Sequence, residues 1–180
     1  MKQILRVLVL FALVTACNNK TNEPAKEDAM PPSEAATMKP SEFADPSYAD
    51  YGKRFISNFT KGDIDAWTND LADNAVFVWS SGDSVAGKAA IGTYWKKRWT
   101  ALDSITFSNE IWLPITVNQP QSIEAPGTWL LGWYMFNEKF KNGKRVIQFA
   151  HDAMHFNSDN KIDRVVHYVD MAPIKAAMGK

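Results

Sequence analysis

Three side chains that can carry or orient a proton, Tyr134, His151 and His167, are spaced so that they could meet on one face of a β-sheet. The dipeptide Asn142-Gly143 favours a two-residue hairpin turn, because both residues tolerate the positive φ values of a type I′ turn. Such a turn places Tyr134 opposite His151, and a further hairpin turn before the last strand places His151 opposite His167. Histidine titrates nearest neutral pH, and a tyrosine hydroxyl can orient it or polarise a carbonyl. The spacing therefore predicts a candidate acid–base row across three adjacent strands.

Apolar side chains are expected around this row. Side chains alternate between the two faces of a strand, so Phe136 and Phe149 fall on the face that carries the three polar residues. Trp79 ends an earlier strand and could line the mouth of a pocket there. In such a pocket the three polar residues would fix the orientation of a small, largely apolar ligand. The alternative is that they are half-buried groups that hydrogen-bond to one another and pack the sheet.

The opposite face of the same strands is also apolar, with Trp129, Leu131, Trp133 and Met135 along one strand. A sheet that is apolar on both sides must have both sides covered. We therefore expect the protein's own helices to cover one face and a second copy of the chain to cover the other, as a homodimer.

A metal or cofactor site receives less support from the sequence. Two histidines could begin a zinc site, but the third ligand would have to be Asp163, His155 or Asp152. The first two lie a step further along their strands, and the last lies on the opposite face. The glycine spacing of a phosphate-binding loop is also absent. The sequence therefore predicts neither a metal nor a cofactor.

The elements that position these residues follow from the periodicity of the chain. Apolar residues at helical spacing predict helices over 48–61, 64–71 and 88–102. Alternating or β-rich runs predict strands over 74–80, 84–87, 105–117, 128–139, 143–156 and 161–170. This order is typical of an α+β domain in which about three helices pack on one face of a curved antiparallel sheet.

The first part of the chain has a different composition. A basic start and the apolar run 7–16 are typical of a secretory signal peptide, because ten apolar residues are too few for a membrane span of roughly 20. The following stretch is rich in proline and acidic residues, which is typical of a flexible tether. We therefore expect a signal peptide over 1–16, a tether over 17–46 and a folded domain over 47–180.

The junction between the signal peptide and the tether carries a recognisable motif. Val14-Thr15-Ala16-Cys17 contains the only cysteine of the chain and resembles the lipobox of bacterial lipoproteins. The resemblance implies acylation of Cys17 and attachment of the mature protein to a membrane of the bacterial cell envelope, on the periplasmic or outer-surface side. The formal net charge is zero and no long basic run is present, which argues against a nucleic-acid partner.

The order of elements, with the stretches FISNFTKGDIDAWTNDLADNAVFVWS and NSDNKIDRVVHYVD, resembles the SnoaL-like branch of the nuclear transport factor 2-like (NTF2-like) superfamily over residues 48–179. The resemblance implies a conical barrel with a pocket between sheet and helices, and dimerisation through the convex sheet face. In cyclase-like members an aspartate on the last strand acts as acid or base, and His167 aligns with that position. The superfamily includes polyketide cyclases, steroid isomerases, dehydratases and non-catalytic binding domains.

We therefore expect a lipid-anchored envelope protein whose SnoaL-like domain binds a small, largely apolar ligand. One alternative is an isomerase, cyclase or dehydratase that uses His167 as general acid or base. The other is an interaction domain that docks another protein through its aromatic sheet face.

Overall fold

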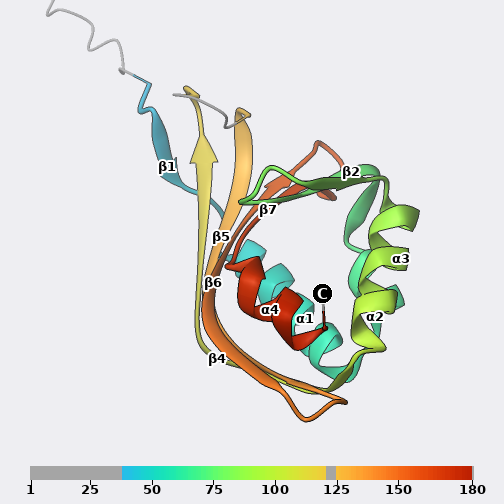
Figure 1. Cartoon of the computed structure of the whole chain (residues 1–180). Coiled ribbons are helices and arrows are strands. Elements are labelled where there is room, and N and C mark those ends of the chain that lie inside the picture. The colour runs from blue at the N-terminus through green and yellow to red at the C-terminus, as the bar shows by residue number, and fades with distance from the viewer. Residues whose placement is uncertain (1–37, 121–124, 180) are drawn as a thin grey trace, which may run out of the picture. The chain divides into compact units, whose positions relative to one another are not determined.

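The computed structural model describes residues 38–120 and 125–179 (Figure 1). The predicted signal peptide over 1–16, the predicted lipidation site Cys17 and most of the predicted tether lie outside the described residues. Among the described residues, no helix has the length and the apolar character needed to cross a membrane.

The helices begin and end where local chemistry requires it. The α-helix α1 (Ala49–Lys61) follows a 3-10 turn, η1 (Pro46–Tyr48), and ends at Gly62, whose φ of +75° favours glycine. The short helix α2 (Ile64–Thr68) is capped by Asp63, whose side chain accepts a 2.9 Å hydrogen bond from the backbone N–H of Ala66. The helices α3 (Lys88–Trp99) and α4 (Met171–Ala177) complete the described set.

The strands form one seven-stranded sheet in the order β1-β4-β5-β6-β7-β2-β3. The pairing is antiparallel throughout, except that β2 and β7 run parallel. The bounds of the strands are β1 Ser41–Phe43, β2 Leu71–Trp79, β3 Ser84–Ala86, β4 Leu102–Val117, β5 Gly127–Phe140, β6 Arg145–Phe156 and β7 Ile162–Tyr168.

The sheet curves around the helices without closing (Figure 1). Its concave face and the helices enclose the core, which is rich in aromatic side chains, among them Phe59, Trp67, Phe77 and Trp95. The helix α4 lies within the open end of this cone. The expected α+β cone with a curved antiparallel sheet is therefore confirmed.

One close approach fixes how α1 crosses the sheet. The ring of Trp112 on β4 lies against two glycines, Gly52 on α1 and Gly132 on β5. A Cβ atom added to either glycine would lie 2.2 Å from a ring atom of Trp112, which no real side chain tolerates. Trp112 therefore acts as the spacer between α1 and the middle of the sheet.

Two described elements were not expected from the sequence. The strand β1 pairs with β4, from Ser41 opposite Val117 to Phe43 opposite Ile115, although it falls within the predicted tether. Its three side chains are exposed, so backbone pairing rather than an apolar pattern holds it. The helix α4 begins at Met171 because the side chain of Asp170 accepts a 2.9 Å hydrogen bond from the N–H of Ala172. The last strand therefore ends before the expected position.

The predicted register of the β5–β6 hairpin is wrong by one residue. Tyr134 lies opposite Ala150, not His151. The turn is a three-residue loop, 141–143, in which Gly143 has a φ of +84° and donates a 2.9 Å hydrogen bond to the carbonyl of Phe140. The extra loop residue reverses the side-chain direction of the whole of β6.

The predicted register of the β6–β7 hairpin holds only at its turn. Phe156 lies opposite Ile162 as expected, but an irregularity follows and His155 lies opposite Arg164. His151 therefore lies opposite Tyr168 instead of His167. Each hairpin shifts the pairing by one residue, and the two shifts cancel between β5 and β7. The side chains of β5 and β7 therefore lie on their expected faces, and only those of β6 lie on the opposite face.

Candidate functional site

A buried carboxylate joins two of the three predicted polar residues on the concave face. Asp152 on β6 is 1% exposed, and its Oδ2 atom lies 2.6 Å from the hydroxyl oxygen of Tyr134 on β5. Its Oδ1 atom lies 2.6 Å from Nδ1 of His167, which is directly opposite on β7. Three neighbouring strands thus place Tyr134, Asp152 and His167 in one hydrogen-bonded network.

The electrostatics of this network keep the hydroxyl proton on Tyr134. Burial raises the pKa of Tyr134 well above its usual range, and the charge of Asp152 and its hydrogen bond raise it further. Tyr134 therefore keeps its proton, and its hydroxyl donates a hydrogen bond to Oδ2 of Asp152. Because Oδ1 of the same carboxylate accepts from Nδ1 of His167, the other ring nitrogen, Nε2, remains for exchange with a bound molecule.

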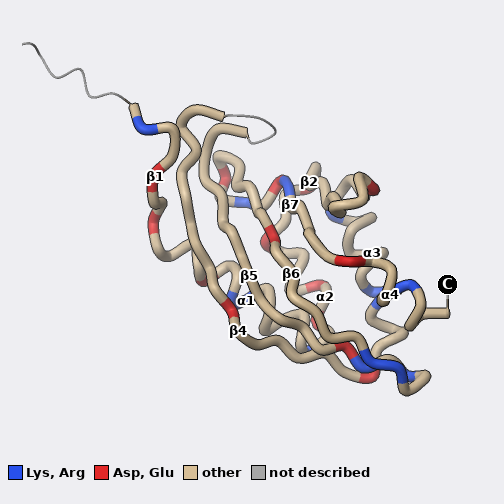
Figure 2. Tube along the Cα trace, turned by 60° about the vertical axis from the view of Figure 1, so that its left-hand side comes forward, with Lys and Arg blue, Asp and Glu red and all other residues tan. Residues whose placement is uncertain are grey.

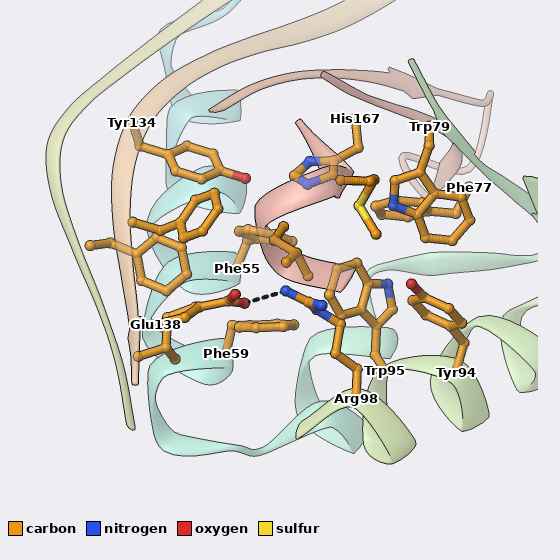
Figure 3. Close-up of a pocket in the computed structure, with 15 residues that line it drawn as sticks. Phe55, Phe59, Phe77, Trp79, Tyr94, Trp95, Arg98, Tyr134, Glu138 and His167 are labelled. Carbon is orange, nitrogen blue, oxygen red and sulfur yellow. Dashed lines mark hydrogen bonds and ion pairs between the residues drawn. The ribbon is translucent and has the colours of Figure 1, made fainter. Parts of the chain in front are cut away.

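His167 and Tyr134 border a small internal cavity of about 30 Å³ (Figure 3). Aromatic side chains from all layers line it: Phe55, Phe59, Phe77, Trp79, Tyr94, Trp95, Phe107 and Phe136. Met171 and Ile174 of α4 close it on one side. The result is an apolar, aromatic chamber with a histidine in its wall.

A wider cleft adjoins the cavity. Its volume is about 380 Å³, and Trp79, Tyr94, Arg98 and Met171 line both spaces. Met178, just after α4, also borders the cleft. These shared residues form the partition between the cavity and the surface.

A buried ion pair lies at the other end of the cavity wall. The Nη2 atom of Arg98 on α3 lies 2.5 Å from Oε1 of Glu138 on β5, and both side chains are almost fully buried. Glu138 points inward because it alternates with Phe136 and Phe140, whose side chains are buried on the same face of β5. The cavity wall therefore has two polar regions, the pair Tyr134 and His167, which Asp152 joins from behind, and the Arg98–Glu138 ion pair. Figure 3 shows Tyr134, His167 and the ion pair.

The structure brings together four of the six predicted site residues. Tyr134, Phe136, Trp79 and His167 all line the cavity. His151 and Phe149 do not, because the reversal of β6 turns both toward the convex face, where Phe149 is 68% exposed. Their placement in the pocket was therefore wrong.

Sequence reasoning placed Asp152 on the opposite face and did not single out Arg98 or Glu138. Asp152 stands between Ala150 and Met154 at the alternate positions of β6, with Phe156 next on the same face, and this apolar run was a usable signal. A carboxylate at such a position is costly to bury without partners, so it indicates hydrogen-bond donors on the neighbouring strands. The partnership of Arg98 with Glu138 joins α3 to β5, and no local spacing reveals it.

The convex face carries an aromatic row of its own. The ring of His151 stacks on Trp133 at 4.7 Å and on Tyr168 at 5.4 Å between centroids, and its Nδ1 lies 2.9 Å from the carbonyl oxygen of Gly132. We call Trp133, His151 and Tyr168 the outer row. Large exposed apolar side chains surround it: Ile111, Ile147 and Phe149. Figure 2 shows Lys and Arg residues gathered at the β5–β6 hairpin, at one end of this face.

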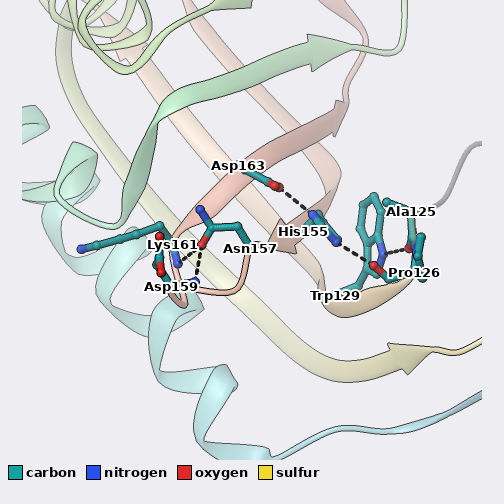
Figure 4. Close-up of polar contacts among 8 residues, drawn as sticks. All are labelled: Ala125, Pro126, Trp129, His155, Asn157, Asp159, Lys161 and Asp163. Carbon is teal, nitrogen blue, oxygen red and sulfur yellow. Dashed lines mark hydrogen bonds and ion pairs between the residues drawn. The ribbon is translucent and has the colours of Figure 1, made fainter.

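The third histidine holds a loop in place (Figure 4). His155 lies 2.6 Å from Oδ1 of Asp163 through Nδ1 and 3.2 Å from the carbonyl oxygen of Pro126 through Nε2. Its ring packs on Trp129, whose indole N–H donates to the carbonyl of Ala125. Both ring nitrogens are thus engaged in fixing the start of β5. Within residues 38–120 and 125–179, no group of three or more His, Cys, Asp or Glu side chains is placed to hold a metal ion.

Comparison with known proteins supports the architecture. The family pattern described as the SnoaL-like domain matches residues 53–165. No curated protein matches the chain significantly. A Bacillus subtilis protein named as a candidate isomerase has a similar structure, with a TM-score of 0.57 and 19% identity, covering 73% of this chain and 91% of its own.

Two further solved structures resemble the chain. A Xanthomonas campestris protein named as a candidate polyketide cyclase has a TM-score of 0.57 and 16% identity, covering 72% of this chain and 94% of its own. A Catenulispora acidiphila protein with a ketosteroid isomerase-like fold, solved with trimethylamine, has a TM-score of 0.54 and 10% identity, covering 72% and 92%. At these identities the likeness shows the fold. Since the family pattern spans more than half of the chain and the architecture agrees with it, the protein belongs to the SnoaL-like domain family.

Proposed function

We propose that the domain binds a small, largely apolar molecule in the aromatic cavity and transfers a proton to or from it through His167. One observation carries this proposal: a fully buried aspartate holds Nδ1 of a histidine whose ring borders that cavity. A carboxylate in this position fixes the tautomer of the imidazole and stabilises the imidazolium that forms when Nε2 takes up a proton.

The chemistry that fits this arrangement is isomerisation or elimination. Nε2 of His167 removes a proton from a carbon next to a carbonyl, and the electron pair of the C–H bond moves into the carbonyl to give an enolate. The proton then returns to a different carbon, or a leaving group departs. Tyr134 is a positioning residue, because its hydroxyl donates a hydrogen bond to Asp152 and so holds the carboxylate that pairs with His167.

The size of the cavity adds a condition. A space of about 30 Å³ holds about two water molecules, so a substrate must displace side chains that close it. Met171 lies in the partition between the cavity and the wider cleft, at the start of α4. We infer that α4 shifts to admit the molecule. Polar contacts to its last turn come from Asn142 and Lys144 of the β5–β6 hairpin.

The test uses a reaction that any base in an apolar cavity can perform. Cyclohexanone in D₂O exchanges the protons next to its carbonyl, and NMR follows the loss of their signal. We expect the full-length protein to accelerate this exchange and His167→Ala to return it to the buffer rate. The matched control is His151→Ala, a histidine on the convex face, which should retain the acceleration. Equal rates for the protein and buffer, or for both variants, would contradict the proposal.

A second function is favoured by the outer row. We propose that the convex face is the interface of a homodimer, because exposed Ile111, Ile147 and Phe149 extend the aromatic surface of that row. Sedimentation of the wild-type chain at micromolar concentration should give a dimer, and Phe149→Lys should give a monomer. Asp159→Lys, at an exposed turn, should remain dimeric. A monomeric wild type would refute this interface.

We also propose, on the sequence alone, that the protein is anchored in the bacterial envelope by acylated Cys17. Mass spectrometry of protein expressed in a bacterial host should show a mature N-terminus at Cys17 with added acyl mass. Cys17→Ser should lack that mass and leave the membrane fraction. An unmodified wild-type chain would exclude lipidation.

A further inference from the structure

Glu138 has a chemical feature that the buried ion pair does not explain. One carboxylate oxygen, Oε1, faces Arg98, but Oε2 is buried and has no hydrogen-bond partner among the described residues. A carboxylate can accept about four hydrogen bonds, and a buried charged acceptor left without a donor is costly. Glu138 lines the aromatic cavity, so a molecule bound there is in a position to supply the donor.

Arg98 is not arranged to satisfy both oxygens. A guanidinium and a carboxylate commonly meet through two parallel hydrogen bonds. Here the second amino group of Arg98 lies 3.6 Å from the sulfur of Met178, and the guanidinium carbon lies 5.7 Å from the ring centre of Trp95. These contacts hold Arg98 away from a two-bond geometry.

The position of Glu138 relative to the Asp152 network defines two ends of the cavity. Tyr134 and Glu138 lie on the same face of β5, four residues apart, which corresponds to about 13 Å along a strand. The buried ring of Phe136 stands between them on the same face of β5 and also lines the cavity. A molecule that reaches both ends must therefore be apolar in the middle and polar at both ends.

The charge of the ion pair selects the kind of donor. Arg98 already balances Glu138, so an ammonium group would bring a further charge into an apolar chamber at a high cost in free energy. A neutral hydroxyl adds the missing hydrogen bond without adding charge. We propose that Oε2 of Glu138 accepts a hydrogen bond from a hydroxyl group of the bound molecule, at the end remote from the carbon on which His167 acts. This inference rests on the proposed function of the cavity.

The first test compares probes that differ in hydrogen bonding but little in shape. Phenol donates a hydrogen bond, toluene does not, and anisole only accepts one. NMR titration of the full-length chain, followed through the indole N–H signals, gives the dissociation constant of each probe. The variant Arg98→Met/Glu138→Leu replaces the ion pair by apolar groups, a change that buried pairs often tolerate.

We expect the preference for phenol over toluene to fall about tenfold in this double variant, because one hydrogen bond to a charged group is lost. Anisole should behave like toluene in both proteins. His151→Ala, on the convex face, is the control, and it should keep the preference for phenol. A preference for phenol that survives the double variant would show that the hydroxyl binds somewhere other than Glu138 and would overturn the inference. Failure of all three probes to bind would instead refute the cavity as a ligand site, and this inference with it.

A second measurement needs no variant. A crystal soaked with 4-bromophenol reveals the orientation of the probe through the anomalous signal of bromine. The expected result is a hydroxyl oxygen at hydrogen-bond distance from Oε2 of Glu138, with bromine toward His167. The reverse orientation would refute the role of Glu138 while leaving the cavity as a binding site.

Discussion

The two faces of the sheet each carry a histidine among aromatic rings, yet the two surroundings differ in kind. Inside the cone, His167 meets the buried carboxylate of Asp152 and borders a cavity. Outside, His151 stacks between Trp133 and Tyr168 and meets only a backbone carbonyl through Nδ1. A carboxylate stabilises an imidazolium, whereas stacking mainly fixes the position of a ring. The presence of a histidine therefore does not by itself identify a site for proton transfer. The group that pairs with the imidazole does, and here that group is the carboxylate of Asp152.

The largest expected effect is on the free energy of unfolding, when a residue on the inner face is compared with its neighbour on the outer face. Glu138→Ala leaves Arg98 buried without its partner, and we expect a loss of about 3–5 kcal/mol in the free energy of unfolding. The neighbouring residue Lys139 points outward and pairs with Asp103 at the surface, so Lys139→Ala should change stability little. Urea unfolding of both variants measures the difference. Equal losses would show that removal of Glu138 does not leave Arg98 as a buried, unpaired charge.

An intermediate effect concerns alkaline pH. Burial raises the pKa of Tyr134, so above about pH 10 the unfolded chain loses the tyrosine proton while the folded protein keeps it. Stability should therefore fall with rising pH, with Tyr134 contributing a slope of up to about 1.4 kcal/mol per pH unit. Tyr134→Phe should flatten this decline in unfolding experiments between neutral and alkaline pH. The outer-row variant Tyr168→Phe serves as the comparison. An unchanged alkaline slope in Tyr134→Phe would argue against a protonated, buried Tyr134.

The smallest expected effect is on the convex face. Phe149 is exposed, so Phe149→Gln should change the unfolding free energy of the monomer by less than about 0.5 kcal/mol. Thermal unfolding at concentrations below the dimer dissociation constant isolates this quantity. Any larger loss would mean that Phe149 packs within its own chain. In a dimer the same variant should instead lower the melting temperature at high protein concentration.

The sequence was sufficient to predict the α+β class, the curved sheet and the long helices, because those depend on periodic apolar patterns. The concave placement of Tyr134 and His167 was also predictable, although it survived only because two register slips cancel. The orientation of β6 was not predictable, since Asn-Gly fits a two-residue turn equally well. The loop instead has three residues, 141–143, and ends in Gly143 at positive φ. Turn geometry at Gly143 thus decided whether Asp152 or His151 entered the site.

The contacts that complete the site depend on long-range packing. Arg98 and Glu138 are 40 residues apart and meet only when α3 packs across the concave face of the sheet. The strand β1 likewise forms because the edge of β4 offers its backbone groups, and its own three side chains, including Phe43, are exposed. Neither the ion pair nor β1 therefore produces a periodic pattern in the sequence.

The ring of Trp112, held between Gly52 and Gly132, has a consequence for how such domains diverge. The three positions lie on α1, β4 and β5, far apart in sequence, yet none can change size alone without a clash or a void. Among homologous chains we therefore expect a side chain at position 52 or 132 to accompany a smaller residue at position 112. The triplet should covary as a unit during evolution, and it should mark the lineages that share this spacing between helix and sheet.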